Sequence, residues 1–99
     1  MRLVYAKEAV ADLKRLRSFI AVHNPQAATK IAKQLTERIE LLLTSPKMGA
    51  PVTLAPDPET VRDLVLGDYV LRYSLHDHTI IILRLWHGLE EERTVTDEV

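Results

Sequence analysis

The sequence predicts an α+β fold in which an antiparallel helical hairpin packs on a small sheet. After a short strand at Arg2 to Tyr5, the first half has apolar residues at intervals of three and four, the period of amphipathic helices. The second half has short apolar segments separated by turn-forming dipeptides, as in β-hairpins. The 99 residues allow one domain, since domains cluster near about 100–150 residues. The predicted order is β-α-α-β-β-β.

Two long helices follow the first strand. The first is predicted over residues 7–22 and the second over residues 25–44. Between them, Pro25 disfavours helical backbone at Asn24, whereas Asn24 is a good N-cap and Pro25 suits the first position of a new helix. So short a turn makes the helices antiparallel. The apolar stripe of the first helix consists of Ala9, Val10, Leu13, Leu16 and Ile20.

The strands come after a loop over residues 46–60, which holds four prolines. Val61–Leu66 and Tyr69–Leu75 flank Gly67-Asp68, a dipeptide suited to a two-residue hairpin turn. Thr79–Trp86 is apolar on both faces and is therefore predicted to be a central strand. The first strand must pair with an edge of this three-stranded meander, and the residues leave open which edge.

The composition excludes several classes of protein. Without cysteine there is no disulfide framework, thiolate metal site or thiol nucleophile, and we expect a cytoplasmic protein. No apolar run approaches the roughly 20 residues of a membrane span, and the first residues do not form a signal peptide. We therefore expect no association with a membrane.

The charge is unevenly distributed. The formal net charge of −1 combines a basic first half with an acidic second half. Residues 1–53 have nine Lys or Arg and four acids, a net charge of +5, whereas residues 54–99 have four Arg and ten acids, a net charge of −6. Charge for solubility is the simple explanation of the basic half. The alternative is a surface that binds an acidic partner.

The first hairpin has a register that the sequence fixes. With a two-residue turn at positions 67–68, Arg62 lies opposite Tyr73 on one face of the sheet. Asp63 and Arg72 are then opposite each other on the reverse face, where we expect a cross-strand ion pair.

The face of Arg84 depends on the second hairpin. A two-residue turn at positions 77–78 places Arg84 on the face of Arg62, whereas a three-residue turn places it on the face of Arg72. Both registers remain open. A shared face would provide a cationic patch that holds a phosphodiester and stacks a base, made of Arg62, Tyr73, Arg84 and Trp86.

Each of these residues also has a structural interpretation. The two arginines could brace the sheet through acidic partners or loop carbonyls, and Tyr69, Tyr73 and Trp86 could simply be core residues. His76 and His78 flank Asp77 in a spacing that is a weak zinc motif, and an exposed turn explains them better. We expect no metal and no cofactor.

The segments AKEAVADLKRLRSFIA, HNPQAA, LLLTSPKMGAP, VRDLVLGDYVLRYSL and IIILRLWHGLEE, taken in order, resemble the RelE/ParE toxin superfamily of bacterial toxin–antitoxin systems, and its ParE-like branch in particular. The resemblance covers residues 3–93. It implies a single toxin domain over residues 1–93, and we expect the acidic tail at 94–99 to be flexible. It also implies a cytoplasmic toxin that arrests growth, stabilises plasmids and is neutralised by an antitoxin.

The branches of the superfamily differ in target. RelE-like members cut messenger RNA on the ribosome, whereas ParE-like members poison DNA gyrase. RNA cleavage needs proton carriers at the end of the last strand, and His87 alone is in that position, followed by three acids at 90–92. We therefore expect a gyrase inhibitor that acts by binding. The expected target-binding residues are Arg62, Tyr73, Arg84, Trp86 and His87.

Two alternatives stay open. A ribosome-dependent mRNA endonuclease would have Arg62, Arg84 and His87 as its catalytic residues. A degenerate, non-toxic member would only bind its antitoxin.

The resemblance places the antitoxin on the helical hairpin and the sheet, and an acidic amphipathic segment suits the basic half of the chain. The expected antitoxin-binding residues are Leu16, Arg17, Ile20, Lys30, Lys33 and Arg38.

Overall fold

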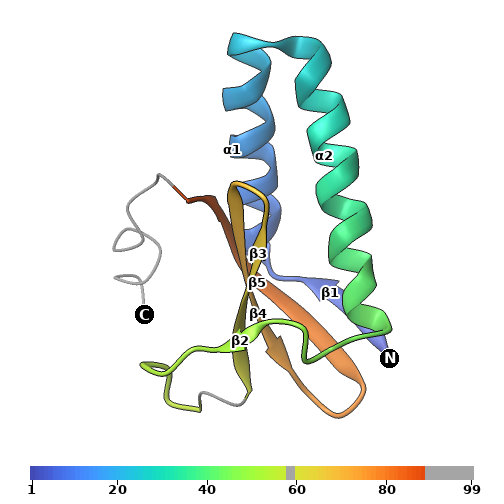
Figure 1. The fold of residues 1–99 in the computed structure, drawn as a ribbon, viewed down its shortest axis with the longest axis vertical. Helices are drawn as coiled ribbons and strands as arrows, with labels where there is room; N and C mark the ends of the chain where they lie inside the picture. Colours follow the sequence, from blue (N-terminus) through green and yellow to red (C-terminus); the bar gives the residue numbers. More distant parts are fainter. Residues whose placement is uncertain (58–59, 89–99) are drawn as a thin grey trace.

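The computed structural model describes residues 1–57 and 60–88, and in this part of the chain two helices lie on one face of a five-stranded sheet (Figure 1). The predicted α+β class and the order of its elements are confirmed. The expected tail at 94–99 lies outside the described residues. The elements are β1 (Arg2–Tyr5), α1 (Lys7–His23), α2 (Pro25–Glu40), the 3₁₀ helix η1 (Leu41–Leu43), β2 (Ala50–Pro51), β3 (Val61–Leu66), β4 (Tyr69–Leu75) and β5 (Thr79–His87).

The two helices form the predicted hairpin. Asn24 caps α2, because its side-chain oxygen accepts a hydrogen bond from the Ala27 N–H at 3.1 Å. The α-helix ends at Glu40 rather than at Thr44, and Leu41–Leu43 tighten into η1. The joined ends of the helices project beyond the sheet (Figure 1), so this end of the hairpin is not covered by strands. Within the described residues, no helix is both long enough and apolar enough to cross a membrane.

The strand order is β1-β5-β4-β3-β2. β1 therefore pairs with β5, in parallel, from Arg2 opposite Thr79 to Tyr5 opposite Ile82. This pairing confirms β5 as a central strand and identifies the edge that the sequence left open. β2 was not predicted, since its two residues lie in the proline-rich loop and pair only with Asp63 and Arg62 of β3. A proline is tolerated there because β2 is an edge strand.

A β-bulge decides the register of the second hairpin. His76 and Thr79 exchange backbone hydrogen bonds of 2.9 and 3.4 Å, so the turn has two residues. Arg84 nevertheless lies opposite Arg72, because Leu83 is an extra residue between the pairs Tyr73–Ile82 and Arg72–Arg84. The prediction that turn length alone sets the face of Arg84 is therefore wrong. The first hairpin has the predicted pairs.

The core lies between the helices and one face of the sheet. Alternate residues of β3, β4 and β5 point into it, as the period of a strand requires. Its buried members are Ala9, Leu16, Leu35, Ile39 and Leu42 from the helical half and Leu64, Leu66, Leu71, Tyr73, Ile80, Ile82 and Leu85 from the strands.

Candidate functional site

The five expected target-binding residues are not brought together on one surface. Arg62 and Tyr73 pair across β3 and β4 on the face that the helices cover, where they are 7% and 0% exposed. Arg84 and Trp86 lie on the opposite face together with Arg72, since Arg84 pairs with Arg72 and Trp86 with the next residue but one, Val70. The predicted joint patch of Arg62 and Arg84 is therefore corrected, and the bulge is the physical reason.

Arg62 and Tyr73 hold the loop that precedes β2. The Tyr73 hydroxyl donates to the Pro46 carbonyl at 2.8 Å and accepts from the Gly49 N–H at 2.9 Å. Arg62 Nη1 donates to the Gly49 carbonyl at 2.8 Å. Both backbone groups of Gly49 are thus satisfied by side chains of the sheet. The interpretation of Arg62 as a brace to a loop carbonyl and of Tyr73 as a core residue is confirmed.

Burial raises the pKa of the Tyr73 phenol, whereas the hydrogen bond from Gly49 and the charge of Arg62 act in the opposite direction and lower it. The net shift is upward from the ordinary value of 10.0. Tyr73 is thus a protonated hydroxyl that both donates and accepts at neutral pH.

We predict that Tyr73→Phe lowers the free energy of unfolding at pH 7 by about 1–3 kcal/mol, because the buried Gly49 N–H loses its acceptor. Above pH 10 the phenol ionises in the unfolded wild type but keeps its proton in the folded protein, because the pKa of Tyr73 is raised by folding. This ionisation favours the unfolded state and lowers the free energy of unfolding of the wild type, whereas the variant has no phenol at this position to ionise. The difference between the two proteins should therefore narrow as the pH rises from 10. Urea denaturation of both proteins from pH 7 to 11 measures it. A difference that widens above pH 10 would contradict the assignment.

Arg84 is held by Asp12 of α1, a residue that the sequence interpretation missed. Arg84 Nε donates to Asp12 Oδ2 at 2.9 Å and Arg84 Nη2 to Asp12 Oδ1 at 3.2 Å. The Leu85 N–H also donates to Asp12 Oδ2 at 2.9 Å. Arg15 donates to Asp12 Oδ1 at 3.4 Å and to the Leu85 carbonyl at 3.3 Å. Arg84, like Arg62, therefore has a structural partner in the fold.

These contacts close an exposed strand edge. β1 pairs with β5 only as far as Ile82, so in the described part of the chain the edge of β5 beyond Ile82 has no neighbouring strand. Asp12 and Arg15 take the place of that strand for the N–H and C=O of Leu85. One signal in the sequence could have identified Asp12: it lies three residues after Ala9, on the apolar stripe of the first helix.

Two arginines lie between two aspartates across the helix-free face of the sheet. Asp63 accepts two hydrogen bonds from Arg72, at 2.8 and 2.9 Å, as the predicted ion pair. Arg72 and Arg84 are paired residues on adjacent strands, and two like charges in that position are unfavourable unless they are compensated. Asp63 and Asp12 compensate them from either side. The Arg72 guanidinium also lies 5.2 Å from the ring centroid of Trp86, which is 3% exposed.

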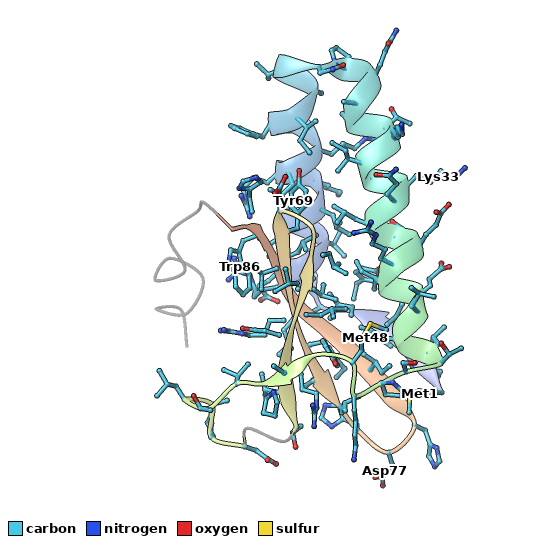
Figure 2. The ribbon with its side chains drawn as sticks, viewed as in Figure 1. Met1, Lys33, Met48, Tyr69, Asp77 and Trp86 are labelled. Carbon is cyan, nitrogen blue, oxygen red and sulfur yellow. The ribbon has the colours of Figure 1, made fainter. Side chains whose placement is uncertain are left out.

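His87 lies at the end of β5, against Tyr69 of β4. Their ring centroids are 5.2 Å apart at an interplanar angle of 86°. Burial raises the pKa of Tyr69, and the negative charge of Asp68 raises it further, to a smaller extent. Figure 2 shows Tyr69 at the tip of the β3–β4 hairpin, beside the helices. His87 is half-buried. It lies at the hairpin-tip end of the sheet, opposite Tyr69, and not beside the loop that Arg62 and Tyr73 hold.

The helical hairpin keeps most of its expected antitoxin-binding residues at the surface. Arg17, Lys30, Lys33 and Arg38 are exposed, Ile20 is half-buried, and Lys33 points away from the fold in Figure 2. Leu16 corrects the prediction, because it is 3% exposed and belongs to the core. The sequence interpretation also missed two exposed apolar side chains on α1, Phe19 and Val22, which are 63% and 81% exposed.

An open groove of about 800 Å³ lies at the other end of the sheet, between the η1–β2 loop and the β4–β5 turn. Met1, Met48 and Asp77 mark it in Figure 2. None of the expected site residues lines it. Over residues 1–57 and 60–88, no three His, Asp or Glu residues are grouped so that they could hold a metal ion.

Comparison with known proteins gives consistent similarities. A family model described as the ParE toxin of the type II toxin–antitoxin system parDE matches residues 3–92. Toxin RelE2 of Caulobacter vibrioides is 32% identical over 88 residues, which cover 88% of this chain and 94% of that protein.

Two solved structures have the same fold. One, of the chromosomal ParDE toxin–antitoxin system from P. aeruginosa, superposes with a TM-score of 0.75 at 25% identity, over 88% of this chain and 95% of that chain. The other, the RelB–RelE antitoxin–toxin complex from Methanococcus jannaschii, superposes with a TM-score of 0.59 at 19% identity, over 96% of each chain.

Proposed function

The chain belongs to the family of ParE toxins of type II toxin–antitoxin systems, and from this membership we propose that it inhibits DNA gyrase by binding and is neutralised by a cognate antitoxin. Both interactions take place in the cytoplasm. The toxin inhibits gyrase by binding, without covalent chemistry, so the affinity of the target surface sets the potency.

The observation that carries the gyrase proposal is the similarity to a ParDE structure. The TM-score with the P. aeruginosa ParDE structure is 0.75, against 0.59 with the M. jannaschii RelB–RelE complex, and both comparisons cover at least 88% of this chain. The match of residues 3–92 to the ParE toxin family supports the same branch.

We place the target-binding surface on the helix-free face of the sheet. Arg84 and Arg72 lie side by side there, next to Trp86. Arginine is one of the residue types that dominate binding energy at interfaces. Trp86, which is 3% exposed, contributes through its contact with the Arg72 guanidinium. Arg62 and Tyr73 are not at this surface and instead act from the core by fixing the loop before β2. His87, which we also expected at this surface, pairs with Tyr69 on the helix-covered face at the end of β5.

The antitoxin surface is proposed on the projecting helical hairpin. Arg17, Lys30, Lys33 and Arg38 supply positive charge there, and Phe19 and Val22 add exposed apolar side chains. An acidic segment with an apolar stripe complements both features, because opposite charge steers association and apolar burial holds the complex. The antitoxin and target surfaces are therefore on different elements of the molecule.

This separation predicts that the two activities respond to different substitutions. Arg84→Gln should raise the concentration for half-inhibition of gyrase at least about tenfold, since one charged contact is lost, and leave antitoxin affinity within about threefold. Glutamine is chosen because its amide can still donate to the buried Asp12. Lys33→Glu should give the reverse pattern. Supercoiling of relaxed plasmid by gyrase and titration calorimetry with the antitoxin measure the two effects.

A second candidate is a ribosome-dependent mRNA endonuclease. The name of the C. vibrioides relative, Toxin RelE2, and the pairing of His87 with the Tyr69 ring favour it. Primer extension on translated mRNA after induction distinguishes the two functions. New cleavage sites in mRNA, with gyrase unaffected by the purified toxin, would replace the gyrase proposal. Induction without growth arrest would indicate a non-toxic member that only binds its antitoxin.

A further inference from the structure

We propose that Asp12 is a positioning residue for the target-binding surface, and that it sets the orientation in which Arg84 meets the target. The inference rests on the proposed function, and it adds to that function a residue of α1 that is itself 3% exposed. Asp12 affects target binding through Arg84, since its own buried carboxylate is not accessible to a large partner.

The Asp12 carboxylate is held in place by a contact that does not involve the Arg84 side chain. Oδ2 accepts the Leu85 N–H at 2.9 Å, so the carboxylate is tied to the backbone of the strand that carries Arg84. Arg84 then donates through both Nε and Nη2, at 2.9 and 3.2 Å. Two parallel bonds to a fixed carboxylate define the plane of the guanidinium as well as its position.

Arg84 needs a fixed carboxylate as its partner because the bulge places it beside another arginine, Arg72. The extra residue Leu83 turns the Arg84 side chain to the face that Arg72 already occupies. The Arg72 guanidinium is fixed by Asp63 on its other side and lies over Trp86. A free arginine side chain samples many rotamers, and a second cation beside it would turn it away. Asp12 removes that freedom and opposes the repulsion.

A purely structural role of Asp12 and a positioning role make different predictions. A structural defect would weaken every activity, with or without Arg84. A positioning defect acts only through Arg84, so the effect of changing Asp12 disappears once Arg84 is changed. A positioning defect also leaves antitoxin affinity unchanged, because the antitoxin surface consists of exposed side chains of the helical hairpin.

The experiment is a double-mutant cycle on full-length protein with Asp12→Asn, Arg84→Gln and the double variant. Asparagine has the shape of aspartate and keeps an oxygen for the Leu85 N–H, but has no charge for Arg84. We expect Asp12→Asn to raise the half-inhibitory concentration for gyrase supercoiling about tenfold. The double variant should match Arg84→Gln within about twofold, and antitoxin affinity should stay within about threefold of wild type. Glu8→Gln, the same change at an exposed acid of α1, is the matched control and should match wild type.

Equal losses from Asp12→Asn in the wild-type and Arg84→Gln backgrounds would overturn the positioning role, as would an equal loss of antitoxin binding. If Asp12→Asn does not fold, Arg84→Lys tests the inference instead. Lysine keeps the charge but cannot make two parallel bonds, so it should be as impaired as Arg84→Gln. Inhibition by Arg84→Lys at the wild-type level would overturn the inference. A wild-type protein that leaves supercoiling unchanged overturns the proposed function itself, and this role of Asp12 with it.

Discussion

Replacing Asp12 with alanine is expected to lower the free energy of unfolding by about 3–5 kcal/mol, the cost typical of removing one partner from a buried ion pair. The Arg84 side chain is 19% exposed, and the substitution removes the carboxylate that holds its guanidinium. It also leaves the Leu85 N–H at the edge of β5 without its acceptor. Domains of this size are commonly stable by about 5–15 kcal/mol, so the loss is a large part of the total. Urea denaturation followed by circular dichroism measures it.

Glu8→Ala is the matched control for this substitution. It removes a carboxylate from the same helix, one turn nearer its start, where the side chain is exposed. Only a favourable interaction with the helix dipole is lost, so the cost should stay within about 1 kcal/mol. Similar losses from Glu8→Ala and Asp12→Ala would mean that the contacts of Asp12 with β5 contribute little to stability.

Gly49→Ala is expected to destabilise the fold by about 3 kcal/mol, from overpacking and from the loss of buried hydrogen bonds. A Cβ atom on Gly49 would lie 2.8 Å from the Asp63 carbonyl oxygen and 2.8 Å from the Tyr73 hydroxyl oxygen. The first contact is with backbone, and the second is with a side chain that is fully buried and bonded to Gly49 itself. Neither neighbour has room to move, so the loop must shift and lose the bonds that hold it.

Ala50→Ser tests whether the effect is specific to Gly49. It also adds one heavy atom, at the next residue, which is the first of β2 and has an exposed side chain. Denaturation of both variants should show a loss for Gly49→Ala and almost none for Ala50→Ser. Wild-type stability in Gly49→Ala would contradict the close approach of Gly49 to Asp63 and Tyr73.

Local patterns in the sequence were sufficient to predict most of the fold. The cap at Asn24, the hairpin turn at positions 67–68 and the apolar residues of β5 each depend on residues close together in the chain, and the structure has all three features. β2 escaped prediction because two residues have no periodicity and are stabilised only by pairing with β3. The partner of β1 likewise depends on tertiary contacts, since a parallel pair needs no turn that the sequence would reveal.

The candidate site was harder to predict for one physical reason. A bulge changes which face every later residue of a strand points to, and the sequence TIIILRLW does not mark where the extra residue falls. Turn length therefore leaves the face of Arg84 open, and a two-residue turn without the bulge would put it on the face of Arg62, opposite to where it lies. Asp12 was passed over for a related reason. Its function depends on a strand that is distant in the chain and comes close only in the folded protein.

The pairing of β1 with β5 also determines when the protein can fold. Arg2 pairs with Thr79, so the first strand of the sheet has no neighbour until almost the whole described chain has left the ribosome. Contacts between such distant segments raise the contact order and slow folding. The same delay applies to Asp12, whose partners Arg84 and Leu85 are synthesised later still. The arginine surface therefore cannot assemble before β5 has been synthesised, whereas α1 and α2, which are adjacent in the chain, can contact each other earlier.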